Sequence, residues 1–375
     1  MGKMDEIKFN DLTAQWELIR ETTLQEIDEL GKRGDYIGGS KISAFESEFS
    51  DYVGSKFSVG ISNGTDALKI AFQMFNLNSE DLVIIPANTF IADYLALKNC
   101  PGSNPKVCLV DHDEDFTIDV KKLEAFLVDE RSNYRKVVLV PVHLYGQSCD
   151  MASLIDIKER FDLIVLEDCS QSHGTTFGNL HVGYLGDVSV YSLYPGKNLG
   201  ALGDAGILTT NNEDYYTRAK SLRNYGSSKK YHYDELGNNH RLDTIQAIVL
   251  SQKLKYLTDW TNSKRVIARR YLDEINNEQV TLPSISDVNS HSFHIFCLTV
   301  SDRDSFTEYM DSAQIPTIIH YPIPIHETKI FDKGDFYTNL ERTNFSKDRI
   351  VSIPLHPFLS NTQIEHIIST INSWK

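Results

Sequence analysis

The middle of the chain, residues 163–206, reads LIVLEDCSQSHGTTFGNLHVGYLGDVSVYSLYPGKNLGALGDAG. It begins with an apolar run that leads to Asp168, and a second apolar run precedes a glycine-rich turn that contains Lys197. Runs that are apolar throughout are typical of strands buried on both faces of a parallel sheet. Because ligands gather at the carboxyl ends of such strands, we expect Asp168 and Lys197 to lie at the same edge of the sheet.

The rest of the N-terminal two thirds repeats this pattern. Strand-sized apolar runs alternate with helical or loop segments; the runs cover residues 82–86, 107–111 and 136–142. Helical spacing of apolar residues covers residues 11–33, 45–52 and 66–75. The alternation predicts an α/β fold with a large, mostly parallel sheet between two layers of helices.

The C-terminal third has a different pattern. We expect one long helical region over residues 243–275, a strand at 291–300, a helix at 303–313 and a strand at 316–321. These elements predict a small α+β domain. The expected division is therefore a large domain over residues 1–250 and a small domain over residues 251–375.

Bulk properties exclude several classes of protein. The net charge of −15 disfavours binding to nucleic acid or to anionic membranes. The five cysteines form no C-x-x-C pair, so we expect neither a metal site nor a disulfide framework. The N-terminus lacks an apolar signal core, and no apolar run approaches the ~20 residues that span a bilayer. We expect a soluble, cytoplasmic protein.

Lys197 and Asp168 suit one cofactor, pyridoxal 5′-phosphate. This cofactor needs a lysine for its aldehyde and a carboxylate beside its pyridine nitrogen. It also needs a phosphate site, which the segment Ser62-Asn63-Gly64-Thr65 at a helix start could supply. Each feature alone has a plainer interpretation: a solvated lysine, a turn aspartate and an ordinary helix cap.

Five motifs extend this hypothesis. In order they are SNGTDAL, PANTFIA, EDCSQSHG, YSLYPGKNLGALGDAG and GNNHRLDTIQA. Together they resemble the DegT/DnrJ/EryC1/StrS family of sugar aminotransferases, over roughly residues 36–326. The resemblance implies the type I fold of aspartate aminotransferase and a homodimer with shared active sites. It also implies transfer of an amino group from L-glutamate to a nucleotide-linked keto sugar.

The resemblance assigns roles to individual residues. Lys197 corresponds to the lysine that holds the cofactor, Asp168 to the partner of the pyridine nitrogen, and Gln171 to a neighbour of the ring hydroxyl. The resemblance also implies that Gly64, Thr65 and Ser192 contact the phosphate and that Phe90 lies against the ring. The alternative for Phe90 is a phenylalanine packed in the core. Asn239 resembles an asparagine that reaches the phosphate in the neighbouring subunit. Cys169 and Asn238 depart from the family pattern.

The substrate residues are less sharply defined. The run HYPIPIH, which starts at His320 and Tyr321, resembles relatives that aminate C-3 of dTDP-linked keto-deoxysugars, an activity that serves the synthesis of O-antigens or other glycans. We expect both residues to line the sugar site, with core packing as the alternative. Three residues of a polar loop could meet the diphosphate or could simply be solvated: Lys229, Tyr231 and His232.

Other functions stay open at this stage. Within the family, the rivals are amination at C-4 and amination of a cyclitol. Family dehydratases carry histidine in place of the lysine, and Lys197 argues against that branch. A regulator that binds the cofactor without turnover is the rival from another class. A nucleotide-dependent oxidoreductase is disfavoured because no G-x-G-x-x-G follows the first predicted strand.

Overall fold

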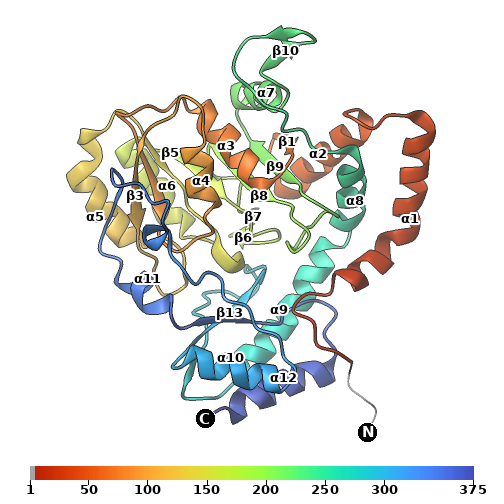
Figure 1. Ribbon diagram of the computed structural model, residues 1–375, viewed down its shortest axis with the longest axis vertical. Helices are drawn as coiled ribbons and strands as arrows, with labels where there is room; N and C mark the ends of the chain where they lie inside the picture. The colour runs from red at the N-terminus through yellow and green to blue at the C-terminus, as the bar shows by residue number, and fades with distance from the viewer. Residues whose placement is uncertain (1–4) are drawn as a thin grey trace.

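An eight-stranded sheet forms the centre of the large domain in the computed structural model, which describes residues 5–375 (Figure 1). Its strands follow the order β1 (Phe57–Ile61), β9 (Gly206–Thr210), β8 (Val188–Ser192), β5 (Ile164–Asp168), β4 (Val137–Leu139), β2 (Leu82–Pro86), β3 (Lys106–Val110) and β14 (Phe336–Tyr337). The strands from β8 to β14 are parallel, whereas β9 runs antiparallel to both β8 and β1. The predicted mostly parallel sheet is confirmed.

Helices cover both faces of this sheet, which explains why its strands are apolar throughout. Val83 and Ile85 of β2 pack in the same core as α3 (Gly64–Met74), α4 (Ala92–Lys98) and α7 (Glu213–Leu222). Leu82 and Ile84 point to the other face and pack with α5 (Val120–Glu130) and α6 (Met151–Phe161). Successive residues of one strand are thus buried on opposite sides.

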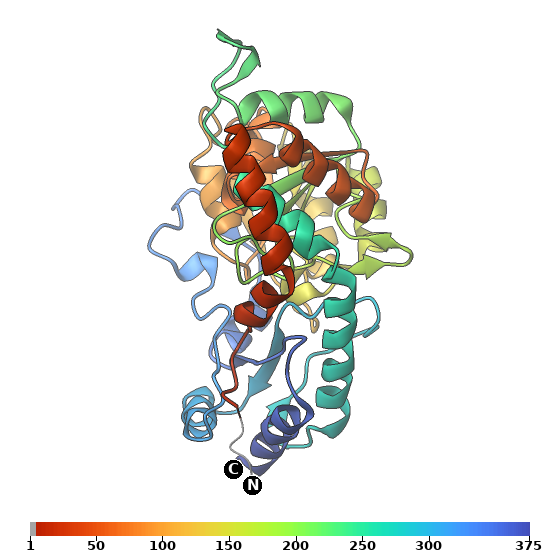
Figure 2. The same ribbon diagram turned by 90° about the vertical axis from the view of Figure 1, so that its right-hand side faces the viewer.

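The end of the sheet at β1 and β9 is covered by α2 (Ser40–Val53) and α8 (Thr244–Leu254), and α1 (Leu12–Arg33) packs on α8 (Figure 2). The helical region predicted over residues 243–275 is confirmed, although it consists of two helices rather than one continuous helix. The chain breaks after α8, and α9 (Leu257–Glu274) runs down to the small domain (Figure 1). Because α8 packs on the large domain and α9 on the small one, the break allows each helix to pack in a different hydrophobic core.

The small domain is an α+β unit, as predicted. A three-stranded antiparallel sheet with the order β12 (Val280–Thr281), β13 (Phe296–Val300) and β15 (Ile350–Ile353) packs with α9, α10 (Arg303–Ser312) and α12 (Asn361–Ser373). The strand predicted at residues 316–321 was wrong, because only an isolated bridge between Ile318 and Ser352 forms there. Pro316 and Pro322 lack the N–H groups that a continuous ladder needs.

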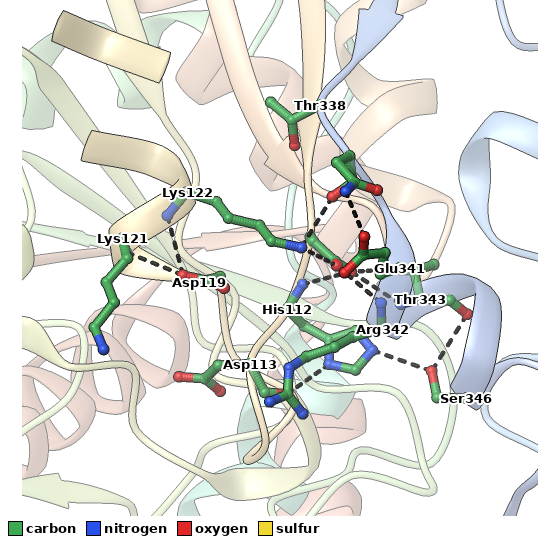
Figure 3. A network of polar contacts seen from close by, with 12 residues as sticks. His112, Asp113, Asp119, Lys121, Lys122, Thr338, Glu341, Arg342, Thr343 and Ser346 are labelled. Atoms are coloured by element: carbon green, nitrogen blue, oxygen red, sulfur yellow. Dashed lines mark hydrogen bonds and ion pairs between the residues drawn. The ribbon is translucent and has the colours of Figure 1, made fainter. Parts of the chain in front are cut away.

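Two segments cross between the domains. Ile7 packs in the small-domain core, while the segment that contains β14 returns to the large sheet and leads into α11 (Glu341–Ser346). A polar network fixes α11 against the loop after β3, and in it His112 Nε2 lies 3.1 Å from Ser346 Oγ (Figure 3). In the same network the buried carboxylate of Asp111 accepts from Lys122 Nζ at 2.7 Å. We therefore propose a domain boundary near residue 250 with two exceptions. The segment around Ile7 belongs to the small domain, and the segment that contains β14 belongs to the large domain.

Two short hairpins lie outside the main sheets: β6 (Thr176–Phe177) with β7 (Leu180–His181), and β10 (Ser227–Lys229) with β11 (His232–Tyr233). The second hairpin projects from the top of the large domain in both views (Figures 1 and 2). Over residues 5–375, none of the helices combines the length and the apolar character needed to cross a bilayer. Residues 1–4 of the charged N-terminal stretch lie outside the described residues.

Candidate active site

A cavity of about 750 Å³ lies where the carboxyl ends of β5 and β8 face the small domain. Asp168 at the end of β5 and Lys197 in the turn after β8 both line it. Sequence-distant segments complete the lining, and they include residues 9–10, 294–295, 318 and 320–321. The structure therefore brings together the two residues on which the sequence hypothesis depends.

Lys197 occupies a tightly folded loop. Its backbone N–H donates to the carbonyl oxygen of Tyr194 at 2.9 Å. A Cβ added at Gly200 would lie 2.3 Å from the carbonyl oxygen of Pro195, so the loop closes only with glycine at this position. The next residue, Asn198, donates from Nδ2 to the carbonyl oxygen of Ser292 at 3.0 Å and thus ties the loop to the small domain. The position of Lys197 is fixed by its neighbours.

The half-buried Lys197 amine is suited to nucleophilic and proton-transfer chemistry. Burial lowers the pKa of Lys197 to about 8, although the charge of Asp168 acts in the opposite direction. With that pKa, roughly a tenth of the amine is neutral at pH 7. A neutral amine can attack a carbonyl group and can also accept a proton.

Asp168 is held at the floor of the cavity and is only 6% exposed. Its N–H donates to the carbonyl oxygen of Pro141 at 2.9 Å, and its Oδ1 accepts from the N–H of Ser170 at 2.8 Å. The preceding residue, Glu167, is fully buried and accepts a hydrogen bond from His143 Nε2 at 3.0 Å. These contacts fix the strand end, so the Asp168 carboxylate presents an acceptor to the cavity.

The N-terminus of α3 forms one wall of the cavity. Asn63 caps this helix by accepting the N–H of Asp66 at 2.8 Å, and Gly64 and Thr65 line the cavity with Ser192. A Cβ added at Gly64 would lie 2.8 Å from Ser192 Cβ, so glycine is what allows the helix start to meet the end of β8. Backbone N–H groups and two hydroxyls at a helix start make an anion site.

Aromatic and amide side chains line the same cavity as Asp168 and Lys197. Phe90 is 49% exposed, which excludes the alternative of a core phenylalanine, and its ring centroid lies 5.4 Å from that of Tyr321. Gln171 Nε2 donates to Tyr321 Oη at 3.0 Å, and Gln171 Oε1 accepts from the N–H of Tyr145 at 2.9 Å. The cavity thus contains both a flat apolar surface and an amide held in place by two hydrogen bonds.

His320 also lines the cavity. Its Nδ1 lies 2.9 Å from Ser352 Oγ, and burial, with a smaller effect of Lys197, lowers the pKa of His320 to about 4. The imidazole is therefore neutral near pH 7. Apolar side chains surround this end of the cavity, and they are Phe9, Ile318, Ile353 and Leu355.

The remaining predicted residues do not reach the cavity within one chain. Lys229, Tyr231 and His232 lie in the projecting hairpin of β10 and β11, where Tyr231 is 76% exposed. Asn239 forms an isolated bridge with Asn224 near the base of this hairpin. None of the four is among the residues that line the cavity in the part of the chain that the structure describes.

Sequence reasoning missed several lining residues. Asp204 lies within a motif already singled out, so its position could have been inferred, whereas Asn10 and His294 come from segments with no distinctive pattern. Asn10 Nδ2 donates to the carbonyl oxygen of Gly196 at 3.3 Å and thus braces the loop that carries Lys197. Cys169, which departs from the family pattern, is fully buried behind the cavity floor.

Comparisons with known proteins agree with this geometry. The profile of the DegT/DnrJ/EryC1/StrS aminotransferase family matches residues 17–372. The chain is 38% identical over 350 residues to the dTDP-3-amino-3,6-dideoxy-alpha-D-galactopyranose transaminase of Aneurinibacillus thermoaerophilus, with 93% of this chain and 94% of that protein covered. It is 32% identical over 370 residues to the dTDP-3-amino-3,4,6-trideoxy-alpha-D-glucose transaminase of Streptomyces venezuelae, with 98% and 96% covered. The crystal structure of S. venezuelae DesV superposes with a TM-score of 0.90 at 32% identity, over 99% of both chains.

Proposed function

The chain belongs to the DegT/DnrJ/EryC1/StrS aminotransferase family, and we propose that it transfers an amino group from L-glutamate to C-3 of a dTDP-linked keto-deoxysugar. The observation that carries this proposal is the placement of the Lys197 amine and the Asp168 carboxylate in one cavity, with a helix N-terminus at its wall. The proposed cofactor is pyridoxal 5′-phosphate, as in the family.

The residues of the cavity fit this cofactor. When bound, pyridoxal phosphate supplies an aldehyde that takes up amino groups and a ring that withdraws electrons from the reacting carbon. The close approach of Gly64 to Ser192 makes an anion site for its phosphate, and Thr65 adds a hydroxyl. Phe90 offers a face for a flat ring, and Gln171 offers an amide to the ring hydroxyl.

Two residues perform the proton chemistry in this proposal. Lys197 has a pKa of about 8 because of burial. Its amine can therefore take a proton from the α-carbon of the amino donor and return that proton to a nearby carbon. Asp168 is fixed by Ser170 and would accept an N–H from the ring of the cofactor. Its negative charge would keep that ring nitrogen protonated.

The sugar end of the cavity favours a deoxysugar. His320 is neutral near pH 7 and can hydrogen-bond a sugar hydroxyl, as can Tyr321. The apolar residues Ile318, Ile353 and Leu355 suit a methyl group better than a charged carboxylate. We therefore assign His320 and Tyr321 to the sugar site.

We further propose a homodimer in which the projecting hairpin completes the cavity of the second protomer. Among residues 5–375, Lys197 is the only lysine or arginine that lines the cavity. A nucleotide diphosphate and the two carboxylates of glutamate require more positive charge than one amine supplies. Lys229, together with Tyr231, His232 and Asn239, is available for this role because the hairpin projects from its own protomer.

We also propose that the protein acts in the cytoplasm, in amino-sugar synthesis for an O-antigen or another glycan. All five cysteines are free and buried, which suits a reducing compartment.

Purified protein incubated with pyridoxal phosphate and L-glutamate tests the proposed reaction. It should convert a dTDP-3-keto-6-deoxyhexose to the 3-amino sugar, detected by mass spectrometry, and should convert the matched dTDP-4-keto sugar much more slowly. Faster conversion of the 4-keto sugar would overturn the C-3 assignment. Cofactor binding without conversion of either sugar would favour a regulator. Chromatography with light scattering tests the dimer independently.

A further inference from the structure

A second buried carboxyl group lies behind the proposed cofactor site. Asp93 is in the first turn of α4, three residues after Phe90, and its side chain is 0% exposed. In the described part of the chain its carboxyl group accepts a hydrogen bond from the hydroxyl of Thr89, at 3.0 Å to Oδ2. Its Oδ1 is buried and has no donor among those residues. An unsatisfied buried carboxylate oxygen is costly, so this atom requires a partner.

The carboxyl group beside Asp93 is that of Asp168. The carboxyl groups of Asp93 and Asp168 are neighbours, because the charge of Asp168 and a side-chain interaction with it both raise the pKa of Asp93. Two ionised carboxylates only accept hydrogen bonds, and at such a separation they repel. A single proton between them changes the repulsion into a short, charge-assisted hydrogen bond and satisfies the unpartnered oxygen of Asp93.

The surroundings decide which residue holds the proton. Asp168 faces the cavity and receives the N–H of Ser170 at 2.8 Å, so its charged form is stabilised. Asp93 takes part in no ion pair within residues 5–375. Burial, followed by the charge of Asp168, raises the pKa of Asp93 well above its usual range. Three titratable groups interact electrostatically with Asp93, namely Asp168, Lys197 and Tyr321.

We propose that Asp93 is a positioning residue that stays protonated at neutral pH and donates from Oδ1 to the Asp168 carboxylate. This hydrogen bond fixes the rotamer of Asp168 from behind, while Ser170 fixes it from the side. It also leaves one negative charge rather than two beside Lys197 and the proposed ring nitrogen. The proposed protonation state does not depend on the proposed function, whereas its effect on catalysis rests on it.

Infrared spectroscopy of cofactor-free protein labelled with [4-¹³C]aspartate tests the protonation state directly. At neutral pH, the difference spectrum between wild type and Asp93→Asn should show the loss of one carboxylic-acid C=O band. Asp111→Asn is the matched control, because Asp111 is equally buried but paired with Lys122 and should lose only a carboxylate band. Loss of a carboxylate band in Asp93→Asn would overturn the proposal.

Kinetics test the positioning role. Asp93→Ala should lower kcat about 10- to 100-fold, the effect of losing one hydrogen bond to a charged group. Asp93→Asn, which keeps the size and a neutral donor, should recover most of this loss. An Asn variant as impaired as the Ala variant, or an Ala variant as active as wild type, would overturn the positioning role. A wild-type protein without transaminase activity would refute the proposed function, and the infrared result would still decide the protonation state.

Discussion

Gly64→Ala should weaken cofactor binding because of a specific collision. The added Cβ would lie 2.8 Å from Ser192 Cβ and 3.0 Å from Ser192 Cα. Carbon atoms in contact are about 3.5–4.0 Å apart, so the helix start must move by roughly 0.5–1 Å. Ser192 ends β8, which is paired on both sides in the sheet, and cannot retreat easily. The displacement therefore falls on α3 and on the N–H groups that are proposed to hold the phosphate.

The magnitude follows from the contacts at risk. Forced overpacking costs about 1–3 kcal/mol of folding stability. Loss of one hydrogen bond to a charged phosphate costs about 1.5–3 kcal/mol, which raises the Kd for pyridoxal phosphate about 10- to 100-fold. Absorbance titration of the cofactor-free protein measures the Kd, and urea unfolding measures the stability.

Gly31→Ala is the matched control for this prediction. Gly31 lies in the last turn of α1, and a Cβ there would meet no atom within 4 Å. This variant should gain up to about 1 kcal/mol of stability from helix propensity and should keep the wild-type Kd. If Gly64→Ala binds pyridoxal phosphate as tightly as wild type, α3 is not the phosphate site.

Three further predictions concern charged groups. Because burial lowers the pKa of Lys197 to about 8, the neutral amine increases with pH, and stopped-flow association of pyridoxal phosphate should accelerate about fivefold between pH 7 and 8; a pH-independent rate contradicts this. Asp168→Ala should lower the single-turnover rate with glutamate by about 10²–10³-fold, and an unchanged rate would remove Asp168 from the mechanism. Burial lowers the pKa of Lys264 to about 7 from 10.5, so above pH 7 the unfolded chain binds the proton that the folded chain has released. The free energy of unfolding of wild type should therefore rise relative to that of Lys264→Met as the pH rises from 7, by about 1.4 kcal/mol per pH unit. Urea unfolding of both proteins measures this difference, and the same difference at pH 7 and pH 9 would refute the prediction.

The sequence predicted the strands that are apolar throughout but not the ones at the sheet end. β2, β3, β4, β5 and β8 are recognisable because both of their faces are buried. β1 and β9 were missed, since FSVGI and GILTT are short runs broken by serine, glycine or threonine. The break between α8 and α9 was missed because helical spacing continues through Lys255 and Tyr256, and only the packing on two separate cores separates the helices.

The candidate site, too, could be predicted only in part from the sequence. Asp168 and Lys197 could be predicted because both follow apolar strands and therefore meet at one edge of the sheet. Asp93 could not, since an aspartate in the first turn of a helix is usually explained by the helix dipole. Its contact with Asp168 appears only when α4 and β5 are placed in space. The hairpin residues such as Lys229 are proposed to act across a dimer, which one chain does not contain.

The most direct measurement locates the covalent attachment of pyridoxal phosphate. The loaded protein is reduced with borohydride, digested, and its peptides are sequenced by mass spectrometry. Lys197 should carry the phosphopyridoxyl group in stoichiometric amount, and Lys197→Ala should carry none. Attachment to Lys253 or Lys264, the other buried lysines with lowered pKa values, would contradict the assignment of the active site.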